Sequence, residues 1–261
     1  MRSQASVSPR NYSREPSFLL LAIALTTLAA AATHGAEEQN APAPESLRPD
    51  NLVTAQEWGS RPDPIPDARR HTPRYVTLHH AGVLWTIDRD PAEFIRNMQS
   101  WGKRRAEVEE PPRNVNWPDL PYHFLIAPDG RIFEGRSLDY EPESNTKYDL
   151  QGHLGVELMG NFEEQRPSRA QVESAVKLTA WLTTKFDIPL EHVRTHAQVA
   201  REQTVCPGRD FARYFKDRTF QKWVEETQAG NQPSIELGEP LPNGPTQLIT
   251  ETAATKRPTA P

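Results

Sequence analysis

Residues 74–82 read Arg-Tyr-Val-Thr-Leu-His-His-Ala-Gly, and this stretch decides the fold class predicted for the chain. Its β-branched and aromatic residues favour a strand, and Ala81-Gly82 is typical of a strand end. Because side chains alternate along a strand, His79 and His80 must lie on opposite faces of the sheet. Only one of these two imidazoles can therefore face a given site.

Further strands are expected on the C-terminal side of this stretch. Residues 122–126 and 131–134 are β-rich and flank Pro128-Asp129-Gly130, so they predict a hairpin. Residues 154–159 form another β-rich run, which ends before Gly160-Asn161.

Helices are indicated by apolar residues at a period of 3.6 over 91–105, 168–186 and 210–226. Ser168 and Gln171 form a capping box at the start of the second of these helices. Strands that alternate with helices, together with one hairpin, predict an α/β fold. We expect a single domain over 51–227 with a central mixed β-sheet flanked by helices.

The N-terminal residues 1–36 have the order of a secretory signal peptide. Arg2, Arg10 and Arg14 precede an apolar run from Phe18 to Ala32, and small residues follow. The run is shorter than the roughly 20 residues that a membrane span needs. We therefore expect a periplasmic or secreted protein that meets the membrane only through this segment, if the segment stays uncleaved.

The segments on either side of the expected domain, and the net charge of the chain, lead to further predictions. Residues 37–50 are polar and proline-rich, which is typical of a linker. Residues 228–261 have no apolar period, so we expect a disordered tail. The net charge is −5 and no basic cluster is present, which argues against a nucleic-acid partner. The protein is expected to be a monomer.

Cys206 is the only cysteine in the chain, so it cannot form an intramolecular disulfide. A free thiol in an exported protein is open to oxidation, whereas a bound metal ion would hold it as a protected thiolate. Histidines 79 and 80 of the first strand and His196 at another strand end are candidate co-ligands. Three protein ligands and one open position are what a catalytic zinc site requires.

Two other interpretations of Cys206 stay open at this point. It could be a buried thiol that packs as a small hydrophobe, with surface histidines elsewhere. It could also be a nucleophile, with His196 or His79 as its base. Against the nucleophile, the sequence Cys206-Pro207-Gly208 is not typical of a helix start, and a helix N-terminus often lowers the pKa of a catalytic cysteine.

Four sequence blocks occur in an order that resembles a known family. They are LHHAG at 78–82, WPDLPYHFLIAPDGRIFEGR at 117–136, LGVELMGNF at 154–162 and TVCPG at 204–208. Together they resemble the zinc N-acetylmuramoyl-L-alanine amidases, which include peptidoglycan recognition proteins and phage amidase lysozymes. The resemblance spans about residues 53–215, and TAQEWGSR at 54–61 is similar to the entry of recognition-protein domains.

The resemblance implies roles for individual residues. It implies Zn²⁺ as the cofactor, with the ligands His79, His196 and Cys206, whereas His80 matches a position that is not a ligand. Tyr122 matches the family tyrosine that assists at the metal-bound water and the developing oxyanion. Thr204 would donate a hydrogen bond to the tetrahedral intermediate.

Glu157 matches the general base of the cytoplasmic anhydro-muramyl-peptide amidases. Family members with the active-site tyrosine commonly lack this glutamate, but the present chain has both. A carboxylate within an apolar strand costs several kcal/mol unless it is paired, and beside a metal-bound water it would have a proton to accept. The alternative is a glutamate on the solvent face of an edge strand.

The implied function is an exported zinc hydrolase that acts on peptidoglycan or muramyl-peptide fragments. It would cleave the amide between the lactyl group of N-acetylmuramic acid and the L-alanine of the stem peptide. The main alternative is a non-catalytic peptidoglycan-binding recognition module. Recognition proteins that do not cut typically replace a metal ligand, often the cysteine by serine, whereas all three are kept here.

The chain departs from the family pattern at three places. Trp101-Gly102 stands where many members have Trp-His, and a charged insertion follows from Lys103 to about Val115. The loop at 144–153 gives no match to the family histidine and asparagine that hold muramyl peptide. The sequence therefore assigns no substrate contact in this loop.

Overall fold

The computed structural model describes residues 43–108 and 116–251, so the predicted signal peptide at 1–36 lies outside the described residues. Within them, one six-stranded mixed sheet has the order β1-β4-β3-β5-β2-β6. The strands are β1 (Leu52–Val53), β2 (Tyr75–His80), β3 (Phe124–Ile126), β4 (Ile132–Glu134), β5 (His153–Leu158) and β6 (Val193–Thr195). Only β3 and β4 pair antiparallel, as the predicted hairpin requires. The predicted α/β fold with a mixed sheet is confirmed.

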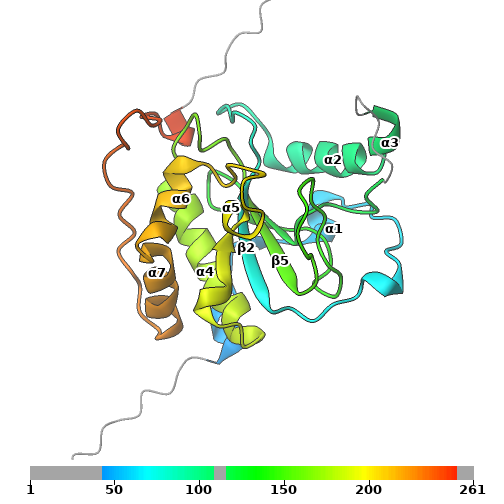
Figure 1. Ribbon diagram of the computed structural model, residues 1–261, viewed down its shortest axis with the longest axis horizontal. Coiled ribbons are helices and arrows are strands. Elements are labelled where there is room, and N and C mark those ends of the chain that lie inside the picture. The colour runs from blue at the N-terminus through cyan, green and yellow to red at the C-terminus, as the bar shows by residue number, and fades with distance from the viewer. Residues whose placement is uncertain (1–42, 109–115, 252–261) are drawn as a thin grey trace, which may run out of the picture. The chain divides into compact units, whose positions relative to one another are not determined.

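Helices lie on both sides of the central strands (Figure 1). The α-helices are α1 (Ala55–Trp58), α2 (Pro91–Gly102), α3 (Arg105–Val108), α4 (Arg169–Lys185), α5 (His196–Val199), α6 (Arg209–Lys216) and α7 (Thr219–Gln228). Short 3₁₀ helices are η1 (Pro44–Leu47), η2 (Asp67–Arg69), η3 (Leu190–His192) and η4 (Ile249–Glu251). In Figure 1, α4, α6 and α7 group on one side of β2, away from α2 and α3.

Two of the predicted helices differ from the structure. The helix expected over 210–226 is two helices, because Arg218 at the start of α7 has a φ of +63° and interrupts the hydrogen-bond ladder. The helix expected over 91–105 ends at Gly102, and α3 follows separately. The capping box of α4 is confirmed, since Ser168 accepts a hydrogen bond from the Gln171 amide. None of the described helices is long and apolar enough to cross a bilayer.

The two faces of the central strands differ in chemistry. The face covered by α4 is apolar apart from His80 at the end of β2, and its fully buried residues include Val76, Leu78, Leu154, Val156 and Leu158. The rings of Trp181 on α4 and Phe124 on β3 meet edge-on with centroids 6.0 Å apart. Since Phe124 is the register partner of Val156, this contact shows that α4 lies over the apolar face. The opposite face carries Thr77, His79, His153 and Glu157. Strand alternation thus places apolar side chains under the helix and polar ones over the other face.

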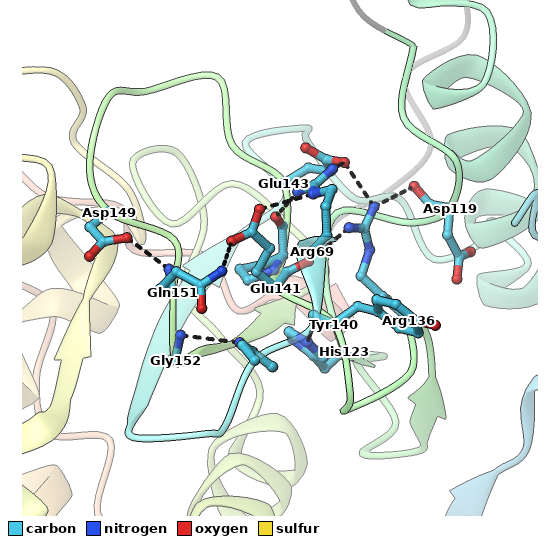
Figure 2. Close-up of polar contacts among 12 residues, drawn as sticks. Arg69, Asp119, His123, Arg136, Tyr140, Glu141, Glu143, Asp149, Gln151 and Gly152 are labelled. Atoms are coloured by element: carbon cyan, nitrogen blue, oxygen red, sulfur yellow. Dashed lines mark hydrogen bonds and ion pairs between the residues drawn. The ribbon is translucent and has the colours of Figure 1, made fainter. Parts of the chain in front are cut away.

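A network of buried ion pairs lies beside this polar face (Figure 2). Glu143 pairs with both Arg69 and Arg136, and the Arg136 side chain is 0% exposed. The Glu143 amide also donates to the Pro121 carbonyl at 3.1 Å. Buried charges are tolerated when they are paired and hydrogen-bonded. The network therefore fixes the segment that ends at Glu143, from which the next loop leaves.

The C-terminal strap, defined here as residues 231–251, is ordered, so the prediction of disorder over 228–261 is wrong for this part. Ile235 and Ile249 are 2% and 0% exposed and belong to the core. Three arginine side chains outside the strap donate to its main-chain carbonyls: Arg166 to Leu237 and Gly238, Arg209 to Asn243, and Arg213 to Glu239. Isolated apolar anchors and main-chain hydrogen bonds leave no periodic pattern in a sequence. Residues 252–261 lie outside the described residues.

The N-terminal flank is likewise part of the packed structure where it is described. Of the predicted linker at 37–50, residues 44–47 form η1, and Leu47 packs against the core. The polar composition of this stretch predicts a linker, because a single half-buried leucine leaves no pattern in a sequence.

Candidate metal centre

The structure brings the three predicted ligands together. His79 lies near the end of β2, His196 begins α5 directly after β6, and Cys206 lies in the loop before α6. One ligand atom from each side chain lies within 4.8 Å of the other two. Cys206 Sγ is 3.7 Å from His79 Nδ1, and the two imidazole centroids are 4.5 Å apart.

Local structure around Cys206 presents its sulfur to the sheet. The Cys206 amide donates to Thr204 Oγ1 at 3.0 Å, and the His80 amide donates to Cys206 Sγ at 3.3 Å. Gly208 has a φ of +85°, and a Cβ at this position would lie 2.5 Å from the Phe162 carbonyl carbon. Glycine is therefore needed for the loop to approach the segment after β5. The Cys206–Pro207 peptide bond is cis.

The donor set fits a zinc ion. Burial lowers the pKa of His79 well below its ordinary value and lowers that of His196 to about 4. Both imidazoles are therefore neutral near pH 7 and keep a lone pair for a metal. Burial raises the pKa of the Cys206 thiol, opposed by the hydrogen bond from the His80 amide. A thiolate at this place needs a cation beside it, and two imidazoles with one thiolate are typical zinc ligands.

Glu157 lies beside this cluster. It is the register partner of His79 in the parallel β2–β5 pair and is 1% exposed. Its Oε1 atom has no hydrogen-bond partner among the described residues. Burial raises the pKa of Glu157 to about 8, opposed by a hydrogen bond with Tyr122. The alternative of a solvent-facing glutamate on an edge strand is wrong, because β5 lies between β3 and β2.

Tyr122 leans over the same face of the sheet. Its ring centroid is 5.0 Å from that of His79. A Cβ on Gly155 would lie 3.3 Å from Tyr122 Cδ1, so the missing side chain of residue 155 makes room for this ring. Burial raises the pKa of Tyr122 well above its ordinary value, and the nearby Glu157 adds to the effect. The phenol therefore stays protonated and can donate a hydrogen bond.

His80 and Thr204 lie at the margins of the cluster. His80 is on the helix-covered face, where its Nδ1 accepts from the Phe162 amide at 3.1 Å, as the alternation of β2 predicts. Thr204 is half-buried, and its hydroxyl oxygen is engaged by the Cys206 amide. The hydroxyl proton of Thr204 is left to donate elsewhere.

The geometry disfavours Cys206 as a nucleophile. A helix does begin just after this segment, because α6 starts at Arg209 with Gly208 as its N-cap. Cys206 nevertheless lies outside the first turn of that helix. The pKa of the thiol is raised by burial, whereas a nucleophilic cysteine needs it lowered.

Sequence reasoning missed the loop at 144–149, which crosses the cluster. Thr146 Oγ1 lies 2.6 Å from His196 Nε2, and the Tyr148 ring centroid lies 5.7 Å from that of His196. Hydroxyl-bearing residues in a loop are common, so the sequence alone carries no signal that separates these contacts from solvent-exposed ones.

Comparisons with known proteins support the family resemblance. The peptidoglycan-recognition protein SD of Drosophila simulans is 27% identical over 181 residues, which cover 67% of this chain and 88% of that protein. The solved structure of Drosophila PGRP-LB is 25% identical, with a TM-score of 0.50, and the match covers 64% of this chain and 92% of that one.

A further solved structure is that of human PGRP-IβC in complex with glycosamyl muramyl pentapeptide. It is 26% identical with a TM-score of 0.50, and the match covers 62% of this chain and 92% of that chain. The sequence profile of the N-acetylmuramoyl-L-alanine amidase family matches residues 69–209, more than half of the chain and the span that holds all three clustered ligands. This chain therefore belongs to the N-acetylmuramoyl-L-alanine amidase family.

Proposed function

We propose that this protein is an exported zinc hydrolase that cleaves the amide between the lactyl group of N-acetylmuramic acid and the L-alanine of peptidoglycan stem peptides. The observation that carries the proposal is the cluster of two neutral imidazoles and a thiol beside Glu157, whose Oε1 lacks a hydrogen-bond partner among the described residues. A relative with a similar fold was solved with a muramyl pentapeptide bound, which supports the substrate class.

His79, His196 and Cys206 would hold the zinc ion. Bound by three protein ligands, zinc polarises a carbonyl and makes water a nucleophile near neutral pH. All three ligands are at least nine-tenths buried, so little solvent competes with them for the ion.

In this mechanism Glu157 would transfer protons, and Tyr122 would stabilise the developing negative charge. With its pKa raised to about 8, the Glu157 carboxyl is mostly protonated near pH 7 in the metal-free site, and a cation held beside it would favour the carboxylate. As a carboxylate, Glu157 would take a proton from the attacking water on Oε1 and return it to the nitrogen of the departing L-alanine, so that the amide becomes a carboxylic acid and a free amine. The Tyr122 hydroxyl and the Thr204 hydroxyl donate hydrogen bonds to the oxygen that gains negative charge.

Export follows from the predicted signal peptide at 1–36, which would deliver the enzyme to the periplasm or the medium. In either place its partner is peptidoglycan or fragments of it. The proposal includes a monomeric enzyme with no nucleic-acid partner.

The test is the release of stem peptide from a defined muramyl peptide. We expect a new free amino group on L-alanine, detected by mass spectrometry, with the reaction abolished by a chelator and restored by Zn²⁺. The relatives are named as recognition proteins, so binding without cutting is the competing outcome. Retention on sacculi with no new peptide N-terminus, across several stem peptides, would establish the recognition module and reject the hydrolase.

A further inference from the structure

The loop at 144–149 covers the outer edge of the His196 imidazole. Thr146 Oγ1 lies 2.6 Å from His196 Nε2, and Ser144 Oγ lies at a longer 3.5 Å from the same nitrogen. Since Nε2 already has a partner from the loop, Nδ1 is the nitrogen left free to bind a metal ion. A metal-binding histidine commonly donates its second N–H to an oxygen, which fixes the tautomer and the ring orientation.

The hydroxyl of Thr146 is set to accept this hydrogen bond. Thr146 Oγ1 lies 2.9 Å from Ser144 Oγ, which can accept the Thr146 hydroxyl proton. Ser144 Oγ also accepts from the Thr146 amide at 3.1 Å, so the two residues form a local turn that orients the hydroxyl. With its own proton directed to Ser144, Thr146 Oγ1 offers a lone pair to His196 Nε2–H.

Contacts on both sides hold the loop over the imidazole. On one side Gln203, in the segment that leads to Cys206, binds the main chain of Lys147 twice: the Lys147 amide donates to Oε1 at 2.8 Å and Nε2 donates to the Lys147 carbonyl at 2.9 Å. On the other side the Arg105 guanidinium donates to Asn145 Oδ1. A hydroxyl held from two directions keeps one position at low entropic cost.

Arg105 belongs to the charged insertion that starts at Lys103, for which the family pattern gives no role. It is 4% exposed, and its guanidinium carbon lies 3.8 Å from the Trp117 ring centroid and 5.4 Å from that of Trp101. Arg105 thus contributes a support that reaches the loop through Asn145.

We propose that Thr146 is a positioning residue for His196: its hydroxyl accepts the Nε2–H hydrogen bond and so leaves the Nδ1 lone pair free for the metal ion. This inference rests on the metal site of the proposed function. It assigns a role to a loop that has no match to the family pattern, and it makes the Arg105–Asn145 contact part of the support for the metal centre.

The first experiment is performed on metal-free protein, so its result does not depend on zinc. Long-range ¹H–¹⁵N spectra at pH 7.5 report the tautomer of each histidine, and the His196 signals are assigned by their loss in His196→Gln. We expect the Nε2–H tautomer in the wild-type protein and in Thr146→Ser, and a mixture of tautomers in Thr146→Val. An Nδ1–H tautomer in the wild-type protein, or an unchanged tautomer in Thr146→Val, would overturn the inference.

The second experiment measures zinc affinity by competition with a chromophoric chelator. We expect the zinc dissociation constant to rise about 10- to 100-fold in Thr146→Val, to stay near the wild-type value in Thr146→Ser, and to be unchanged in Lys147→Ala. Lys147 is a matched control because it lies in the same loop, is exposed, and contacts Gln203 only through its main chain. Equal affinities of the Val and wild-type proteins would contradict the role of Thr146 and leave the zinc site intact. A wild-type protein that binds no zinc would instead reject the proposed function, whereas the tautomer result would still decide the orientation of His196.

Discussion

Glu157 and His79 are direct neighbours across the parallel β2–β5 pair, and their side chains leave the sheet on the same face. The sheet ladder therefore sets the spacing between the carboxylate and the first predicted metal ligand. Ladder hydrogen bonds on both sides of β5 make this spacing more rigid than a loop could.

Replacing Glu157 by glutamine distinguishes a role of this residue in proton transfer from a role in zinc binding. The amide keeps the shape of the carboxylate but cannot take a proton, so we expect kcat to fall about 10²- to 10⁴-fold with zinc content unchanged. Release of stem peptide and elemental analysis measure the two quantities. Glu173→Gln on α4 is the control and should leave kcat as it is. A kcat of Glu157→Gln within twofold of wild type would remove Glu157 from the reaction.

Tyr122→Phe removes the hydroxyl and keeps the ring that packs on Gly155. We expect kcat to fall about 10²-fold, the usual cost of losing one oxyanion donor, with little change in Tm. Steady-state kinetics and thermal melting check this result. A larger loss in Tyr122→Phe than in Glu157→Gln would make the phenol the main proton-transfer group.

Cys206→Ser removes the soft ligand while keeping a side chain of similar size. We expect zinc binding and hydrolysis to be lost, with binding to peptidoglycan retained. Zinc content after dialysis, product release and sedimentation with sacculi measure these three properties. The variant would argue against the metal site if it held zinc as tightly as the wild-type protein.

Acid should destabilise the metal-free protein through His123. Its Nε2 donates to the Tyr140 carbonyl and its Nδ1 accepts from the Gly155 amide, so the ring is neutral in the fold. Burial lowers the pKa of His123 from 6.5 to about 3. The unfolded chain binds the proton first as pH falls, so stability is full above about pH 6.5 and declines toward pH 3.

Urea unfolding at several pH values tests this linkage. One proton contributes at most about 1.4 kcal/mol per pH unit to the slope of the unfolding free energy. His123→Gln should lower the slope between pH 6 and pH 4 by up to this amount. The same slope in both proteins would show that His123 is not protonated on unfolding in this range.

Truncating an isoleucine that anchors the strap should lower the unfolding free energy much more than truncating an exposed isoleucine elsewhere. Ile249 is 0% exposed, whereas Ile87 is 68% exposed. Ile249→Ala should lower the unfolding free energy by about 2–5 kcal/mol, as buried truncations do, and Ile87→Ala should change it by less than about 0.5 kcal/mol. Equal effects in denaturant titrations would mean that the strap is not docked in solution.

Features set by neighbouring residues were predictable from the sequence. The capping box of Ser168, the turn at 128–130 and the opposite orientations of His79 and His80 each depend on a few adjacent positions. The family resemblance then predicted His196 and Cys206 as co-ligands of His79, although they lie far apart along the chain, and the structure brings the three together.

Contacts between distant loops were not predictable. Thr146 and His196 are 50 positions apart, and Arg166 and Leu237 are 71 apart. Neither pair has a periodic or local signature, because a hydroxyl or a carbonyl can find a partner anywhere along the surface of a fold. The order of the strap was missed for this reason, and so was the loop over His196.

The arginines that hold the strap touch carbonyl oxygens, which every amino acid carries. A change of side chain at Glu239 leaves its carbonyl in place for Arg213. Leu237, which packs against the core, and Gly238, with a φ of +65°, are constrained by more than these hydrogen bonds. An exposed position such as Glu239, which holds the strap only through its carbonyl, is therefore a place to attach a label.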